Sequence, residues 1–182
     1  MKLDQEKTNQ EALLTSSASD FNTKLLELVS LNELLAWSLQ EENPRLAFRS
    51  SWALEHLLLK NVQLFDGIHA QVIDGYNNSK NWSALRSYSK LLMWLCSKKN
   101  QQYTLSDVQE IALIEKSFFL LEQPNCPVAV KVNVMDILHL QIEKHDWIRN
   151  ELKLLIELEL EKGASPALKS RGAYILKRIL KP

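Results

Sequence analysis

Histidine and carboxylate pairs at short spacings are the residues of this 182-residue sequence that could carry chemistry. His139 and Glu143 are four positions apart, so on a helix they would share one face and could fill two positions of a metal site. Two ligands are too few for such a site, and we expect an ordinary, partly buried histidine instead. His145 precedes Asp146, which we expect to cap a helix rather than to orient an imidazole ring.

Patterns for nucleophilic catalysis and phosphate binding are missing from the sequence. Glu157, Glu159 and Glu161 place two carboxylates on one helical face, which usually indicates a solvated surface. The four glycines are isolated, with neither G-x-G-x-x-G nor P-loop spacing. Cys96 and Cys126 are far apart and lack C-x-x-C spacing, so we expect reduced, buried thiols. The sequence thus predicts a protein that is not an enzyme and that uses no metal and no cofactor.

Composition favours a helical protein that is not broadly cationic. Hydrophobic residues make up 46% of the chain, and only 4 Gly and 5 Pro interrupt it. The 22 Lys and Arg balance 22 Asp and Glu, which excludes a histone-like nucleic-acid binder. The charged N-terminus lacks the apolar core of a signal peptide, and no apolar run approaches the roughly 18 residues of a membrane span. We therefore expect a cytoplasmic protein with no membrane partner.

Helix start signals divide the chain into segments whose apolar residues recur at helical spacing. Ser30 and Ser106 each begin an S-x-x-E/Q capping box, and Asn43 and Ser165 each precede a proline suited to the first helical position. No segment alternates for long enough to predict a strand. The predicted helices lie near 20–42 with a break at Ser30, 44–60, 62–76, 81–98, 106–122, 126–144, 146–162 and 165–181.

Short connections between these helices predict about four hairpins, each an A helix followed by a B helix. In the B helices, Arg49, Arg86, Lys131 and Arg171 align at intervals of about 40 residues. Such a period with two helices per unit is typical of a HEAT-like or armadillo-like α-solenoid, in which each hairpin buries its apolar face against the next. A globular helical bundle with accidental register is the alternative.

The predicted domain organisation is a short leader followed by one domain. Residues 1–19 are mostly polar and have few periodic apolar positions, so we expect a frayed, disordered leader or a loose first helix. Residues 20–182 are long enough to bury a single cooperative core. The prediction is therefore one all-α, HEAT-like domain over residues 20–182.

Several stretches carry a family resemblance: residues 43–57, beginning Asn-Pro-Arg-Leu-Ala-Phe-Arg, residues 128–135 and 146–157, and the closing 169–179. Together they resemble a family of short, single-domain bacterial HEAT-like proteins over most of the chain after residue 20. The resemblance implies a right-handed α-solenoid of uncharacterised function. Some members carry the name adenylosuccinate lyase. Where such lyases have a mobile loop reading S-S-x-M-P-x-K-x-N, this chain has Ser50-Ser51-Trp52 inside a predicted helix.

Tryptophan side chains could form a stacking platform for nucleic-acid bases. Each of the five lies within a predicted helix or at its first residue, where large aromatic side chains commonly fill the space between packed helices. Packing in the core or between repeats is therefore the favoured role of Trp37, Trp52, Trp82, Trp94 and Trp147.

Charge is distributed unevenly between the two kinds of helix. The A helices are each net acidic, whereas the B helices are neutral or net basic, most strongly over 80–100 and 164–182. The resemblance implies that B helices line the concave side of the solenoid. A groove lined by one sign of charge attracts a partner of the opposite sign. The candidate residues for binding an acidic protein segment are Arg45, Arg49, His56, Arg86, Lys90, Lys131, Arg171, Lys177 and Arg178.

The aligned residues Arg49, Arg86, Lys131 and Arg171 have an alternative role as a ladder between repeats, with their charged groups paired to neighbouring carboxylates. The favoured function is a non-enzymatic protein-interaction or scaffold module. A nucleic-acid binder that uses the same basic groove is the alternative, and a lyase-type enzyme is a remote one.

Overall fold

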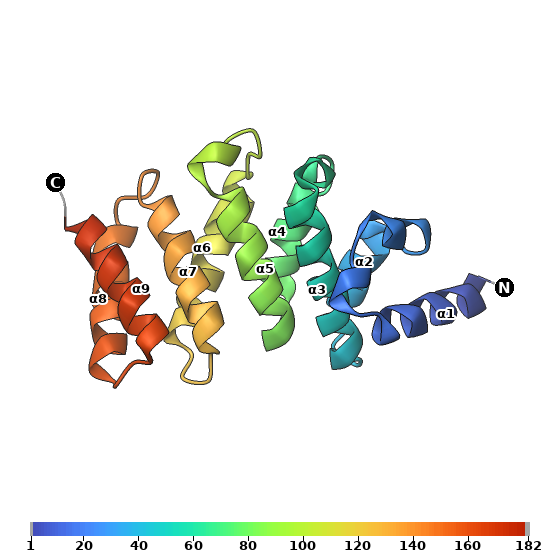
Figure 1. Cartoon of the computed structure of the whole chain (residues 1–182). Coiled ribbons are helices and arrows are strands. Elements are labelled where there is room, and N and C mark those ends of the chain that lie inside the picture. Colours follow the sequence, from blue (N-terminus) through green and yellow to red (C-terminus); the bar gives the residue numbers. More distant parts are fainter. Residues whose placement is uncertain (1, 181–182) are drawn as a thin grey trace. The chain divides into compact units, whose positions relative to one another are not determined.

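The computed structural model describes residues 2–180, and α-helices joined by loops and short 3-10 segments make up that range (Figure 1). No strand occurs among these described residues, which confirms the all-helical class predicted from the sequence. Short 3-10 turns lie at Ala18–Asp20, Thr23–Glu27, Val62–Phe65 and Lys98–Asn100. The α-helices are α1 (Lys2–Thr15), α2 (Leu31–Ser38), α3 (Pro44–Lys60), α4 (His69–Asn78), α5 (Trp82–Leu95), α6 (Asp107–Glu122), α7 (Val128–Gln141), α8 (Ile148–Glu161) and α9 (Pro166–Ile179).

Side-chain caps start the helices where the sequence indicates. The amide of Glu33 donates to the Ser30 hydroxyl at 3.2 Å, and the amide of Ser30 donates to the Glu33 carboxylate at 2.8 Å. Ser106 starts α6 with a capping box of the same kind. Asn43 and Ser165 accept bonds from backbone amides at the proline-led starts of α3 and α9. These groups satisfy backbone donors that have no partner inside the helix.

Two predicted helices differ in extent from those in the structure. The segment expected to be helical from residue 20 contains 3-10 turns before α2, because Asn22 accepts from the amide of Lys24 and starts a new turn. The segment expected from residue 62 begins as a 3-10 turn and reaches α4 only at His69. Gly67 lies between them with a φ of +81°, a backbone conformation that ends a helical turn and favours glycine.

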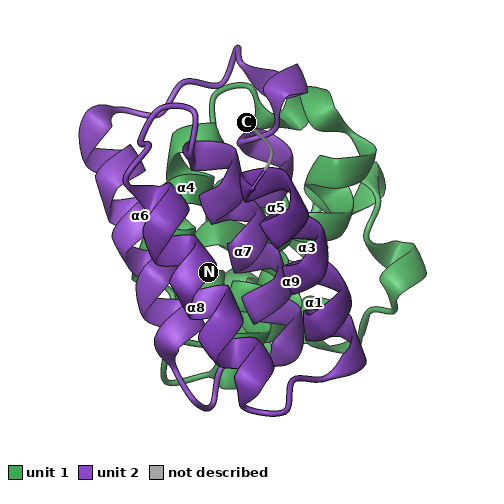
Figure 2. Ribbon diagram, turned by 90° about the vertical axis from the view of Figure 1, so that its left-hand side faces the viewer, with its two compact units in different colours: residues 1–91 green, residues 92–182 purple. Residues whose placement is uncertain are grey.

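The chain forms two compact units, residues 1–91 and residues 92–182 (Figure 2). In the first unit, α3 is the central helix: α1, α2 and the turn at Val62–Phe65 all pack against it. In the second unit, α7 is central and contacts α6, α8 and α9. The side chains of Val130, Val134 and Leu138 on this helix are fully buried. No helix within residues 2–180 is both long and apolar enough to cross a membrane.

Candidate functional site

Arg49 holds the C-terminal end of α1 against α3. Its Nε and Nη2 atoms donate to the carbonyl of Leu13 at 3.3 Å, and Nη2 also donates to the carbonyl of Ser16. The guanidinium carbon lies 5.0 Å from the centre of the Phe21 ring and 5.2 Å from that of Trp52. Carbonyls at a helix end lack partners inside the helix, and Arg49 supplies them. This predicted partner-binding residue therefore uses its guanidinium group for contacts within the protein.

Lys90 and Glu55 join α5 to α3 in the first unit. The ammonium group of Lys90 donates to Glu55 Oε1 at 2.5 Å, and the hydroxyl of Ser87 donates to Oε2 at 2.8 Å. The Glu55 side chain is 12% exposed, whereas that of Lys90 is 56% exposed. Lys90 is thus a surface residue whose charge is already paired.

Arg171 and Asp136 make an equivalent bridge between α9 and α7 in the second unit. Nη1 of Arg171 donates to Oδ1 of Asp136 at 3.3 Å. The two residues are 35 positions apart, the same separation as Glu55 and Lys90. Burial raises the pKa of Asp136, while Arg171 and Arg178 act in the opposite direction.

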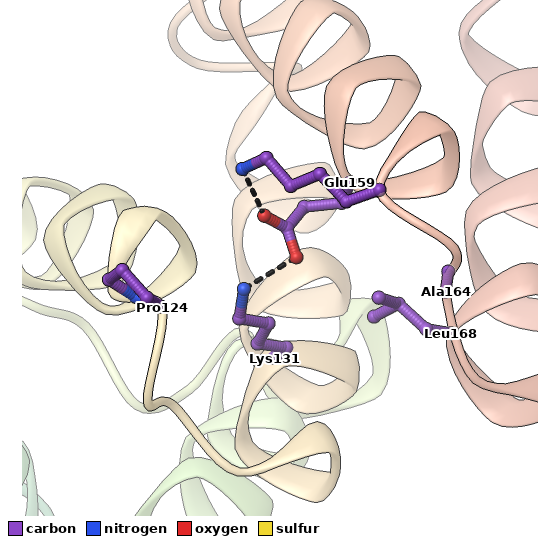
Figure 3. A pocket seen from close by; sticks show the side chains of 6 residues that line it. Pro124, Lys131, Glu159, Ala164 and Leu168 are labelled. Carbon is purple, nitrogen blue, oxygen red and sulfur yellow. Dashed lines mark hydrogen bonds and ion pairs between the residues drawn. The ribbon is translucent and has the colours of Figure 1, made fainter.

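Lys131 lies in a surface pocket of about 350 Å³ in the second unit (Figure 3). It donates to Oε2 of Glu159 at 2.5 Å, and Lys162 donates to Oε1 of the same carboxylate at 2.9 Å. Burial alone would raise the pKa of Glu159, but the bonds from the two lysines outweigh it and hold the pKa below its ordinary value. Glu159 is therefore ionised at neutral pH and is a poor general acid. The pocket is lined by Pro124, Lys131, Glu159, Lys162, Ala164 and Leu168.

The exposed face of α9 gathers the remaining predicted cations of the second unit around an aromatic ring. Tyr174 is 44% exposed, and its ring centre lies 4.4 Å from the guanidinium carbon of Arg178 and 5.4 Å from that of Arg171. Lys177 and Arg178 are both exposed. We call Arg171, Tyr174, Lys177 and Arg178 the α9 cationic patch.

Comparisons with protein-family models, curated proteins and solved structures found no match to this chain. Its candidate site is therefore defined by geometry and charge alone.

Three further candidates lie in the first unit. Arg45 on α3 and Arg86 on α5 are exposed, and the amide group of Asn81 donates to the carbonyl of Pro44 at 3.2 Å, which holds the starts of these helices together. His56 packs edge-on against Trp52 with ring centres 5.4 Å apart. Burial, together with Lys60, lowers the pKa of His56, so its ring is neutral at pH 7. The structure does not place His56 among exposed cations.

The residues whose types could carry chemistry have other partners. Glu143 forms an ion pair with Lys98. Among residues 2–180, no group of three His, Cys, Asp or Glu side chains is placed to hold a metal ion. The predicted cap at Asp146 is wrong, because Trp147 occupies the cap position of α8. The Asp146 carboxylate instead accepts from Nε of Arg149 at 3.0 Å.

The sequence gives no signal for one cluster, which is centred on the buried side chain of Glu110. His145 contacts Oε1 of Glu110 through Nε2 at 2.6 Å, and Lys144 donates to Oε2. A cavity of about 290 Å³ beside them is also lined by Cys96 and Gln141. Burial raises the pKa of the Cys96 thiol to about 12, so the thiol is protonated and a poor nucleophile at neutral pH.

The tryptophans divide between core and surface. Trp37 is 2% exposed, which confirms the packing role expected for it. Trp52, Trp82 and Trp94 are half-buried, and Trp52 stacks on Phe48 with ring centres 5.6 Å apart. Trp147 is exposed and stacks on Phe118. The other four tryptophans are buried or half-buried, so the described tryptophans form no common exposed surface on which bases could stack.

Proposed function

We propose that this protein is a non-enzymatic interaction module that binds an acidic segment of a partner protein on the α9 cationic patch. The proposal is carried by one observation: the guanidinium carbons of Arg171 and Arg178 lie 5.4 and 4.4 Å from the centre of the exposed Tyr174 ring. Tyrosine and arginine are among the residue types that most often dominate the binding energy of protein interfaces. Lys177, on the same side of the helix, adds a further positive charge.

The chemistry of the patch suits carboxylates. A guanidinium group can donate two parallel hydrogen bonds to one carboxylate, and it also stacks on aromatic rings. Arg171 has one donor committed to Asp136, and Arg178 lies against Tyr174, so both groups are held in position before a partner arrives. Restricting these side chains in advance lowers the entropy that binding must remove.

We also propose that the hairpins are HEAT-like repeats of an α-solenoid. The support is the recurrence of one bridge: Glu55 with Lys90 in the first unit, and Asp136 with Arg171 in the second, each pair 35 positions apart. Both bridges join a helix to the next but one along the chain, as expected for equivalent helices of successive hairpins. The bridges also support the ladder role considered for Arg171.

Fluorescence anisotropy with a labelled, glutamate-rich peptide tests the proposed binding. We expect the wild-type protein to bind the peptide and the variant Lys177→Glu/Arg178→Glu to lose at least about tenfold in affinity. Lys24→Glu/Lys99→Glu is the matched control, because it makes the same change of charge at two exposed lysines elsewhere.

A labelled DNA duplex distinguishes the nucleic-acid alternative in the same assay. Binding through phosphates weakens steeply with salt and depends on several cations at once. If the duplex binds more tightly than the peptide and Lys177→Glu/Arg178→Glu abolishes that binding, the proposed protein partner is wrong. Failure of the wild-type protein to bind the acidic peptide at low salt would also contradict the proposal.

A further inference from the structure

The outer sides of α6 and α8 expose large apolar side chains. Phe119 on α6 is 54% exposed, and Trp147, which directly precedes α8, is 55% exposed. Soluble proteins rarely expose contiguous apolar patches of large side chains unless the patch binds something. The other exposed apolar residues of these segments are Val108, Ile111, Leu154 and Leu158.

Helical spacing groups these residues into two stripes. Val108, Ile111 and Phe119 recur at three and eight positions, which places them on one side of α6. Leu154 and Leu158 are four positions apart on α8. The rings of Phe118 and Trp147 stack with their centres 5.6 Å apart and their planes at 27°, which joins the two stripes. Figure 2 shows both helices in the second unit.

Carboxylates are interleaved with the apolar side chains. Glu115 lies between Ile111 and Phe119 in the α6 stripe, and Glu151 lies between Trp147 and Leu154 in the α8 stripe. All the exposed acidic residues of these helices add to the same negative field: Asp107, Glu115, Glu122, Glu151, Glu157 and Glu161.

Basic side chains offset only part of this charge, because α6 and α8 carry three of them, Lys116, Arg149 and Lys153, against these six carboxylates. Lys116 lies 5.9 Å from the centre of the Phe119 ring, and Lys153 lies 4.0 Å from Glu157. The surface is therefore both apolar and net acidic. We call the two stripes with their interleaved carboxylates the acidic apolar face.

We infer that the acidic apolar face docks a cationic amphipathic helix of a partner protein, at a second interface distinct from the α9 cationic patch. The apolar stripes would take the apolar side of such a helix, and the carboxylates would pair with its flanking Lys and Arg. Charge complementarity selects this occupant and rejects the acidic segment proposed for α9, because like charges across an interface repel. The two surfaces therefore bind partners of opposite charge.

A labelled amphipathic peptide of Leu and Lys, helical when bound, is the probe for this interface. We expect Phe119→Ala/Leu154→Ala to weaken its binding at least about tenfold, because both are large exposed side chains, one from each stripe. Leu28→Ala/Leu39→Ala is the matched control, since it truncates two exposed leucines of the first unit. A peptide of the same composition without an apolar side should bind far more weakly.

The outcome separates this inference from the proposed function. Binding of the Leu/Lys peptide should survive Lys177→Glu/Arg178→Glu, whatever that variant does to acidic peptides. Equal affinity for Phe119→Ala/Leu154→Ala and the wild-type protein would overturn the inference, as would equal binding of the non-amphipathic peptide. Analytical sedimentation tests whether a second copy of this chain covers the face instead. A wild-type dimer that is lost both in Phe119→Ala/Leu154→Ala and in Lys177→Glu/Arg178→Glu would show that a second copy, not a partner protein, covers it.

Discussion

Lys131 donates to Oε2 of Glu159 at 2.5 Å, and the two side chains are only 7% and 9% exposed. This buried ion pair lines a pocket and joins α7 to α8 in the second unit. Removing two charges from water is costly, and only their mutual attraction and further hydrogen bonds offset that cost. The bond from Lys162 to the same carboxylate is one of these. A lysine considered for partner binding thus has a structural role.

Removing the carboxylate should therefore destabilise the fold. We expect Glu159→Ala to lower the free energy of unfolding by about 3–5 kcal/mol, because Lys131 would remain buried without a counter-charge. The double variant Lys131→Met/Glu159→Leu should recover most of the loss, since it removes both buried charges. Urea unfolding followed by tryptophan fluorescence measures both. A loss in Glu159→Ala no larger than that of an exposed ion pair would contradict the buried role.

Stability should also fall in acid through Glu110. Burial alone would raise its pKa, but the hydrogen bonds from Lys144 and His145 outweigh burial and hold the pKa below the ordinary value of a glutamate. Below that value the unfolded chain binds more protons than the folded one. The stabilising contribution is fully present at a pH above the ordinary pKa of a glutamate and is lost as the pH falls through the lower, folded pKa.

Urea unfolding across this acid range measures the effect. We expect the free energy of unfolding of Glu110→Gln to depend less steeply on pH than that of the wild-type protein. Asp136→Asn is the contrasting variant, because burial raises the pKa of Asp136 and gives its contribution the opposite sign. Identical pH profiles for Glu110→Gln and the wild-type protein would show that Glu110 has no such role.

Local signals explain which parts of this fold are predictable from sequence. The capping boxes at Ser30 and Ser106 are recognisable because each involves residues three positions apart. The failed cap at Asp146 shows the limit of that logic, since Arg149 competes for its carboxylate. Apolar periodicity alone predicts one helix over 62–76, but the turn at Gly67 interrupts it.

Pairing between helices explains why the candidate site is only partly predictable. The alignment of basic residues does identify Arg171, whose carboxylate partner lies on a neighbouring helix. It does not distinguish Arg86, which is exposed, from Lys131, which is buried. The difference arises because Glu159 on the adjacent helix lies opposite the ammonium group of Lys131. The relative register of the two helices determines that contact, and the sequence alone does not reveal the register. The same dependence hides the contact between Glu110 and His145.

Arg49 should control the attachment of α1. We expect Arg49→Met to cost about 1–3 kcal/mol, because it leaves the carbonyls of Leu13 and Ser16 without their donor while keeping the apolar stem. Amide hydrogen exchange should accelerate across α1 but not in the second unit. Arg45→Met is the control, since Arg45 is exposed on the same helix. Unchanged protection of α1 in Arg49→Met would rule out this role.

The contact between Gly75 and Tyr88 leaves no room for a methyl group. A Cβ at Gly75 would lie 2.5 Å from Cζ and the hydroxyl oxygen of Tyr88, whose hydroxyl also bonds Ser38 at 2.5 Å. We expect Gly75→Ala to destabilise the protein by about 1–3 kcal/mol through overpacking, although alanine is the better helix former. Thermal melting measures the effect. In a Tyr88→Leu background the cost should shrink, and an equal cost there would refute the clash.

Charge exchange at the α9 cationic patch tests the proposed binding of an acidic segment most directly. Glutamate-rich and lysine-rich peptides without apolar residues are titrated against the wild-type protein and against Lys177→Glu/Arg178→Glu. We expect the variant to lose affinity for the acidic peptide and to gain affinity for the basic one beyond the wild-type level, with both effects weakening as salt rises. A correctly folded variant that binds the acidic peptide as tightly as the wild-type protein would contradict the assignment of α9 as the binding site.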